Sequence, residues 1–307
     1  MSPRALIAAT QSGVVRVTRD DGGGSWTTEP LLSSVDVRCL ARDEGVLYAG
    51  TQSGDVHRST DGGRSWSLSH VADAPVKSLA AGHGTVYAGT KEPRVHVSAD
   101  AGASWRPLAG FTPRRSWWWA QPAERPFRPT YVSALAVVPG TIVAGIEACG
   151  VFRSTDRGRT WSGHRHGALR DCHELAFADG CLYEAGFGGL AASTDGGGTW
   201  SRRGDGLDRR YGWSVAAAAG TIYLTAAPAR SAHTRNSRAR VFRAFGDGAW
   251  EPCTDELPTL ARLSAIADEI FAALGDGTVL GSGDHGDSWE ALPVNLGGSS
   301  RALLATG

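Results

Sequence analysis

The sequence predicts an all-β fold, a seven-bladed β-propeller of four-stranded blades, and three observations support this prediction. A short motif that ends in tryptophan recurs along the chain. The segments between its copies each contain about four β-type runs. The two ends of the chain supply complementary parts of one repeat. One such repeat cannot bury its apolar face alone, so its copies are expected to stack against one another.

The recurring motif reads STDGGRSW at residues 59–66 and STDGGGTW at residues 193–200. An aspartate side chain accepts hydrogen bonds from the backbone N–H groups that follow it, and glycine adopts backbone angles that other residues resist. The tryptophan then anchors the turn by burying its ring. The motif therefore predicts a tight turn and gives its aspartate a structural role. Its seven copies end at Trp26, Trp66, Trp105, Trp161, Trp200, Trp250 and Trp289.

Between the tryptophans, one unit shows four β-type runs, at residues 37–41, 46–51, 56–59 and 65–69. Four short strands in about 40 residues are typical of one propeller blade. We name these strands A to D from the inside outward, which places the motif at the C–D turn. Two of the intervals between tryptophans are longer, and we interpret each as the same unit with an insertion.

The chain ends indicate how the first blade is completed. Residues 4–13 match a B strand, so the first blade lacks its A strand, whereas residues 299–307 match the A-strand pattern. The C-terminal strand is therefore expected to join the N-terminal blade, which removes an exposed sheet edge. No linker-like tract divides the chain, so we predict a single domain over residues 1–307.

Composition and charge narrow the expected partners and location. Lysine plus arginine equals aspartate plus glutamate at 31 each, so no global field favours nucleic acid or a membrane surface. No apolar run reaches the length of a membrane-spanning helix, and the first residues do not match a signal peptide. Five cysteines without a CxxC motif do not suggest a disulfide framework. We therefore expect a cytoplasmic protein.

The motif resembles the Asp-box, or BNR repeat, of sialidases, some other glycoside hydrolases, sortilin-type receptors and photosystem assembly factors. The resemblance covers the whole chain and implies a seven-bladed propeller. The Arg-Ile-Pro signature of sialidases is missing, since residues 2–6 read SPRAL. The chain is most similar to compact, stand-alone bacterial Asp-box propellers, which include sialidase-like, glycosyl-hydrolase-like and assembly-factor-like proteins. A sialidase proper is therefore not expected.

Function is expected on the face opposite the recurring turns, where the D–A and B–C connections lie. Both insertions fall there, at residues 108–131 and 227–241. The first contains Trp118 between two further tryptophans, which either pack on one another or form an aromatic wall over a ligand.

One position of the A strand varies between blades and is often polar. It predicts either a solvated channel mouth or a cationic, aromatic-lined cavity for a small polar or anionic molecule. The expected ligand-binding residues are Arg38, Lys77, Arg170, Arg210, Trp213, Arg301 and Trp118.

The fifth blade carries carboxylates where the other blades carry small or apolar residues. If residues 178–180 turn its A–B hairpin, Glu174 and Glu184 are cross-strand neighbours beside His173. One of two close, half-buried carboxyls should have a raised pKa, which suits general acid/base catalysis. The alternative is a structural salt bridge with Arg170, Arg209 or Arg210. The candidate catalytic residues are Glu184, Glu174, His173, Glu147, Tyr131, Tyr211 and Asp171.

Three functions remain open at this point. The first is an enzyme, glycoside-hydrolase-like, that needs no cofactor and acts on a small polar or anionic molecule. The second is a non-catalytic propeller that binds a protein through an arginine-rich loop face. The third is a metal-dependent enzyme, in which zinc or copper would be held by His164, His166 and His173.

Overall fold

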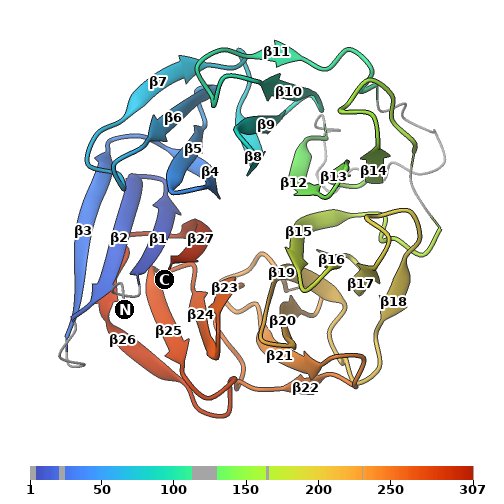
Figure 1. Cartoon of the computed structure of the whole chain (residues 1–307). Coiled ribbons are helices and arrows are strands. Elements are labelled where there is room, and N and C mark those ends of the chain that lie inside the picture. The colour runs from blue at the N-terminus through green and yellow to red at the C-terminus, as the bar shows by residue number, and fades with distance from the viewer. Residues whose placement is uncertain (1–4, 21–24, 113–129, 164–165, 230, 307) are drawn as a thin grey trace. The chain divides into compact units, whose positions relative to one another are not determined.

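The computed structural model describes residues 5–20, 25–112, 130–163, 166–229 and 231–306. These residues form 27 strands in seven antiparallel sheets, with no helix among them (Figure 1). The fold is therefore all-β, and it is a seven-bladed β-propeller, as the sequence predicts. No helix in the described part of the chain is long and apolar enough to cross a membrane.

Each sheet is one blade, and its strands follow the order A to D. Blade one contains β27 (Ser300–Thr306), β1 (Ala5–Thr10), β2 (Gly13–Arg19) and β3 (Trp26–Ser33). Blade two contains β4 (Val37–Asp43), β5 (Val46–Thr51), β6 (Asp55–Ser59) and β7 (Ser67–His70). Blade three contains β8 (Val76–Gly82), β9 (Thr85–Thr90), β10 (Val95–Ser98) and β11 (Arg106–Pro107). Blade four contains β12 (Val132–Val138), β13 (Thr141–Ile146) and β14 (Gly150–Ser154).

The remaining blades follow the same plan. Blade five contains β15 (Cys172–Ala178), β16 (Cys181–Gly186), β17 (Gly189–Ser193) and β18 (Ser201–Arg203). Blade six contains β19 (Tyr211–Ala218), β20 (Thr221–Ala227), β21 (Arg240–Phe245) and β22 (Glu251–Pro252). Blade seven contains β23 (Arg262–Ile266), β24 (Glu269–Ala273), β25 (Thr278–Ser282) and β26 (Glu290–Asn295).

Blade four departs from the expected four strands. Its outermost position holds only an isolated bridge, in which Arg153 and Ser162 exchange two backbone hydrogen bonds of 3.2 and 2.8 Å. The described part of this blade is therefore a three-stranded sheet with one bridged residue at its edge.

The chain forms two compact units. Unit 1 contains Met1–Val37, Gly188–Leu190 and Arg203–Gly307, and thus blades one, six and seven. Unit 2 contains Arg38–Phe187 and Ala191–Arg202, and thus blades two to four and most of blade five.

Closure of blade one occurs within unit 1. The C-terminal strand β27 pairs antiparallel with β1, from Ala5 opposite Thr306 to Thr10 opposite Ser300. The Thr306 hydroxyl also donates a 3.1 Å hydrogen bond to the Ala5 carbonyl. The first and last strands therefore lie in the same sheet, as expected from the sequence (Figure 1).

The recurring motif begins at the end of strand C in each blade, and we call the copies that keep its serine and aspartate the Ser-Asp-Trp turns. In blade two, Ser59 Oγ donates to Asp61 Oδ1 at 2.8 Å and accepts the Gly63 N–H at 2.7 Å. The Ser65 N–H donates to Asp61 Oδ1 at 2.9 Å, and Trp66 Nε1 donates to the Gly63 carbonyl at 3.1 Å. The aspartate carboxylate therefore accepts the hydrogen bonds that hold the turn, which confirms its structural role.

The same hydrogen bonds hold the pKa of these aspartates below the usual value. Bonds from the Thr160 side chain and backbone lower the pKa of Asp156 to about 2. The Thr199 backbone N–H contributes most to lowering the pKa of Asp195 to about 2. A charged carboxylate is what these turns require, because each aspartate only accepts hydrogen bonds there.

Candidate functional site

Each blade has two ends, which differ in their connections. The A–B and C–D connections form the turn end, and the B–C and D–A connections form the loop end. Both insertions lie at loop ends, one between β20 and β21 and one between β11 and β12. Most of the insertion between β11 and β12, including Trp118, lies outside the described residues.

The variable A-strand position that the sequence singled out coincides with a recurrent β-bulge. In five blades the register between strands A and B shifts at this residue, so that the A strand carries one extra residue there. A bulge re-aims a side chain and is common next to functional sites. The fold therefore presents a different side chain at one repeated, irregular position near the loop end. The bulged residues are Lys77, Ser133, His173, Trp213 and Arg301.

In unit 1, four side chains of blades six and seven meet at the loop end, and we call them the loop-end cluster: Tyr211, Trp213, His233 and Arg262. The Tyr211 and Trp213 rings stack with centroids 6.5 Å apart and planes 16° apart. The His233 ring meets both edge-on, at 5.2 and 5.6 Å. The Arg262 guanidinium lies 4.3 Å from the Trp213 ring centroid. Aromatic faces and a cation are thus gathered on one surface.

The strands and one hydrogen bond explain why these side chains meet. Tyr211 and Trp213 begin β19, and Arg262 begins the adjacent strand β23. Ser214 Oγ accepts the Leu263 N–H at 2.9 Å, which ties the two A strands together. The Tyr211 hydroxyl and His233 Nε2 lie 2.6 Å apart, so the insertion is bonded to the strand.

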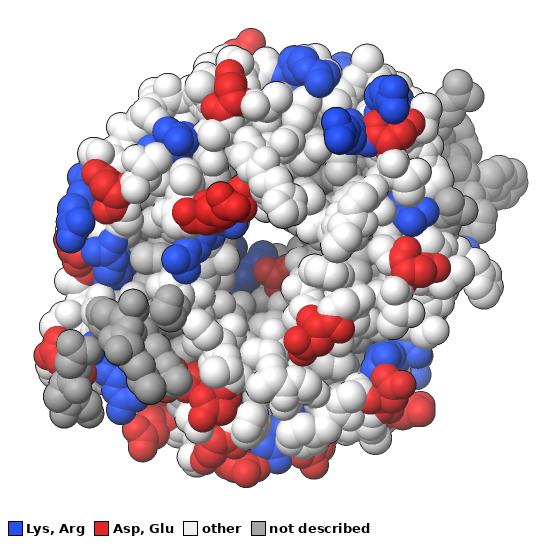
Figure 2. Space-filling model, viewed as in Figure 1, with Lys and Arg blue, Asp and Glu red and all other residues white. Residues whose placement is uncertain are grey.

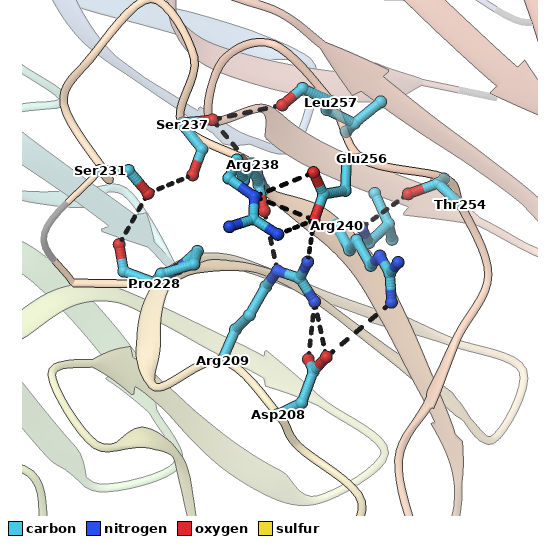
Figure 3. Close-up of polar contacts among 12 residues, drawn as sticks. Asp208, Arg209, Pro228, Ser231, Ser237, Arg238, Arg240, Thr254, Glu256 and Leu257 are labelled. Carbon is cyan, nitrogen blue, oxygen red and sulfur yellow. Dashed lines mark hydrogen bonds and ion pairs between the residues drawn. The ribbon is translucent and has the colours of Figure 1, made fainter.

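The insertion that carries His233 is fixed by a network of ion pairs (Figure 3). Arg209 is 5% exposed and donates to Asp208 at 2.7 Å and to Glu256 Oε1 at 2.7 Å. Its Nε donates to the Arg238 carbonyl at 2.8 Å, and the Arg238 side chain itself reaches Glu256 at 3.0 Å. Ser231 Oγ closes the loop by donating to the Ser237 carbonyl at 2.7 Å. These hydrogen bonds and ion pairs tie Ser231 and Arg238 of the loop to the chain around them.

In unit 2, the structure brings together two pairs of predicted site residues. The Lys77 ammonium lies 5.0 Å from the Tyr131 ring centroid. His173 Nε2 lies 3.3 Å from Asp171 Oδ2, while Asp171 Oδ1 accepts the Ala148 N–H at 2.9 Å. His173 is only 6% exposed, so this pair is largely closed to solvent.

The predicted pairing of Glu174 with Glu184 is wrong. The A–B hairpin of blade five turns on two residues, Asp179 and Gly180, both with positive φ, rather than on three. Glu184 therefore lies opposite Leu175, and Glu174 lies opposite Ala185. Because successive side chains of a strand point to opposite faces, a shift of one residue separates the two carboxyls.

Glu184 is instead a buried carboxyl of the blade core. It is 0% exposed, and its Oε2 accepts the Leu169 N–H at 2.7 Å. Burial raises the pKa of Glu184 to about 8, against the opposing effect of this hydrogen bond. The alternative salt bridge to Arg209 is not formed either, because Arg209 pairs with Asp208 and Glu256.

The other predicted residues are dispersed. Arg170 and Arg210 are exposed, whereas Arg38, Arg301 and Glu147 are half-buried. Arg38 belongs to unit 2 and Arg301 to unit 1, so their joint cavity stays a prediction. Of the alternative metal ligands, His164 lies outside the described residues. Within the described part, no three His, Cys, Asp or Glu side chains are grouped to hold a metal ion.

Sequence reasoning missed His233 and the network that holds it. These residues lie in or beside an insertion that has no counterpart in the other blades, so alignment of the repeats could not single them out. The available signal was the three arginines within residues 235–240, which need acidic partners if they lie on an ordered loop.

Figure 2 shows acidic and basic side chains interspersed over the visible face, without a dominant patch of one sign.

Comparisons with known proteins support the fold. The sequence family described as "DUF6242 beta propeller domain" matches residues 5–115. No curated protein matches the sequence. Three similar solved structures are described as "YCF48 bound to D1 peptide", "Structure of U3-55K" and "Crystal structure of RRP9 WD40 repeats".

The overlap with these structures is extensive, although their sequences differ. The first is 13% identical with a TM-score of 0.61, and the match covers 95% of this chain and 86% of that one. The second is 12% identical with a TM-score of 0.65, covering 97% and 89%. The third is 13% identical with a TM-score of 0.65, covering 98% and 88%. At such identities the likeness concerns the fold alone.

Proposed function

We propose that this chain is a non-catalytic, protein-binding propeller that holds an extended peptide segment of a partner at the loop end of blades six and seven. The observation that carries the proposal is the loop-end cluster, in which β19 and β23 present half-buried aromatic rings and a guanidinium beside His233, whose loop is fixed through Arg209. Among the similar structures, the one described as "YCF48 bound to D1 peptide" is a propeller with a peptide, which is consistent with this function.

The chemistry of the cluster suits a peptide. Tryptophan, tyrosine and arginine are the residues that most often dominate the free energy of protein binding. A planar guanidinium stacked on an aromatic ring can still direct its N–H groups at a carboxylate. The preferred segment therefore combines an acidic side chain with an aromatic or aliphatic one. The peptide site would then be part of the arginine-rich loop face that the sequence predicts.

The fixed insertion favours binding because less conformational entropy is lost. Arg209, Glu256 and Arg238 hold the loop before any ligand arrives, as their distances show. A surface that is already ordered loses less entropy on binding than one that must be ordered by its partner. The network thus acts as a scaffold for His233.

The family and the domain organisation form part of the same proposal. The geometry of the Ser-Asp-Trp turns supports the resemblance to Asp-box propellers, and we assign the chain to the assembly-factor-like rather than the sialidase-like members. We also propose that residues 1–307 act as a single domain, with protein partners in preference to small polar molecules, and that the protein works in the cytoplasm.

A display library of random 12-residue peptides, followed by fluorescence polarisation with the selected sequences, tests the binding site. We expect Trp213→Ala and Arg262→Gln each to weaken binding at least about tenfold, since both residues are placed as central contacts. Arg64→Gln, an exposed change at a turn end, serves as the matched control. Equal affinity for parent, Trp213→Ala and Arg262→Gln, or a library that yields no ligand, would contradict the proposal.

The hydrolase hypothesis rests on one observation, the raised pKa of Glu184. A carboxyl that stays protonated near neutral pH has the property that a general acid needs. However, Glu184 is 0% exposed and has lost its expected carboxylate neighbour, so a substrate cannot reach it in this conformation. The binding function is therefore the better supported of the two. Turnover of a panel of aryl glycosides that Glu184→Gln abolishes would reverse this order.

A further inference from the structure

A pocket of about 280 Å³ lies at the turn end of unit 1, between the sheets of blades seven and one. Its lining comes from the ends of strands that meet there: Arg19 ends β2, Trp26 begins β3 and Glu269 begins β24. This is the end of the blades opposite to the loop-end cluster, and no residue is shared between the two places.

The apolar side of the pocket is aromatic. The rings of Trp26 and Phe271 pack edge to face, with centroids 6.0 Å apart and planes at 76°. Phe271 is 4% exposed, whereas Trp26 is half-buried and so retains accessible ring surface. Among aromatic side chains, an accessible indole face attracts cations most strongly.

The polar side of the pocket is acidic. Three carboxylates line it, from Glu269, Asp284 and Glu290, against the single cation of Arg19. Hydrogen bonds from Ser288 hold the pKa of Asp284 well below its usual range, so that this carboxylate stays charged. The Glu269 side chain is only 12% exposed, and solvent therefore screens its charge less than it would at the surface.

The position of Arg19 indicates which kind of ligand the pocket accepts. Its guanidinium carbon lies 5.8 Å from the Trp26 ring centroid, and its Nη1 lies 3.8 Å from Glu269 Oε1. The Arg19 side chain is 45% exposed, and the ion pair is long, so the chain's own cation is held only loosely. A guanidinium thus already lies between the indole ring and the carboxylate, in a pocket with room for another.

We propose that this pocket binds an arginine side chain of a partner protein, with its guanidinium against Trp26 and its N–H groups directed at Glu269 and Glu290. Arginine fits better than lysine because a planar guanidinium can stack on the ring and bond a carboxylate at the same time. Arg19 moves aside and competes with the ligand. The inference does not depend on the peptide site, since it uses the other end of the blades.

Calorimetric titration of the full chain with N-acetylarginine amide tests the proposal, with N-acetylcitrulline amide as the neutral analogue of equal shape. We expect a Kd on the order of 1 mM for the arginine compound, as befits a single side chain, and at least about fivefold weaker binding of citrulline. N-acetyllysine amide should fall between them.

Two variants separate a binding role from a structural one. Glu269→Gln should weaken arginine binding at least about fivefold, whereas Arg19→Ala should strengthen it severalfold because a competing cation is removed. Glu44→Gln, at the turn end of blade two, is the matched control and should leave the affinity unchanged. A gain in affinity cannot arise from partial unfolding.

Three results would overturn the proposal. These are equal binding of the arginine and citrulline compounds, an Arg19→Ala variant that binds no more tightly than the parent, or no binding of N-acetylarginine amide at 10-fold above the expected Kd. Each outcome is independent of whether peptides bind at Trp213.

Discussion

Glu184 is a buried carboxyl whose ionisation destabilises the folded state. The carboxyl is 0% exposed, and its pKa rises from 4.5 to about 8 on folding because burial disfavours the charge. The folded state therefore binds this proton more tightly than the unfolded chain does. Its contribution to stability is complete below pH 4.5 and is lost as the pH rises through about 8.

We accordingly expect Glu184→Gln to change the pH dependence of stability. At pH 5 the variant should match the parent closely, because a glutamine oxygen can still accept the Leu169 N–H. At pH 9 the variant should be more stable by a few kcal/mol, roughly 1.4 kcal/mol for each unit of pKa shift. Urea unfolding of both proteins from pH 5 to 9 measures this difference. A difference that stays constant across the range would show that Glu184 is not protonated in the fold.

Glu184 also shows which part of the candidate site could not be predicted from the sequence. The sequence shows Glu184 at a position where the other blades carry small or apolar residues, and a raised pKa was expected there from a second carboxyl, whereas burial raises it. Its partner was not visible, because the choice between a two-residue and a three-residue turn at Asp179 moves Glu174 to the other face. A difference of one residue in the length of the turn decides which face carries Glu174, and the periodicity of the sequence does not indicate the length of the turn.

At the scale of the elements, the Ser-Asp-Trp turns are the most regular feature. In blade five, Ser193 is 2% exposed, accepts the Gly197 N–H at 2.8 Å and donates to Asp195 at 2.8 Å. The turn also reaches blade four, since Arg153 Nε donates to the Gly196 carbonyl at 2.9 Å. The Ser193 hydroxyl thus holds the turn, and the backbone of the turn contacts the neighbouring blade.

Ser193→Ala should therefore lower the free energy of unfolding by about 1–2 kcal/mol, because the buried Gly197 N–H is left without an acceptor. Ser201→Ala, an exposed change on β18 of the same blade, should change it by less than about 0.5 kcal/mol. Denaturant unfolding of the two variants beside the parent provides the comparison. Equal stability of Ser193→Ala and Ser201→Ala would show that the turn does not depend on its serine.

The sequence predicted these elements well because local chemistry determines them. Turn residues, strand alternation and the tryptophans that end the motif all repeat about every 40 residues, and each copy reinforces the others. The β-bulge of the A strands could not be predicted, because a bulge shows only in the hydrogen-bonded register. The variable residue that lies at the bulge was nevertheless singled out from the sequence. The loop holding His233 could not be derived, because its conformation depends on Glu256, far along the chain.

At the scale of the molecule, the C-terminal strand completes the first blade. β27 pairs along the whole of β1, and its Leu303 is 6% exposed in the core that blades one and seven share. Without β27, the row of backbone groups on β1 would become an open sheet edge, which favours association with other chains.

Removal of residues 299–307 should therefore lower the thermal midpoint by roughly 10 °C or more and promote aggregation, because a full strand and its apolar contacts are lost. Calorimetry and light scattering of the shortened chain measure both effects. A truncated protein that stays monomeric with an unchanged midpoint would contradict closure by this strand.

The repeated architecture explains how a binding surface arises in this protein. The repeats form nearly identical strands. The binding residues come from the places where the repeats differ, namely Trp213 at a β-bulge, the inserted loop and the buried Arg209 that holds this loop. A function assigned to such a fold must therefore be argued from the places where the repeats differ.

The most direct test of peptide binding at the loop-end cluster is a double-mutant cycle between Arg262 and an acidic residue of the best peptide selected by the parent protein. The cycle compares Arg262→Gln with replacement of the peptide glutamate by glutamine, singly and together, by fluorescence polarisation. If the loop-end cluster binds the peptide as proposed, the acidic position closest to Arg262 should show a coupling energy of about 1 kcal/mol or more. Coupling near zero at every acidic position of the peptide would show that the peptide binds elsewhere.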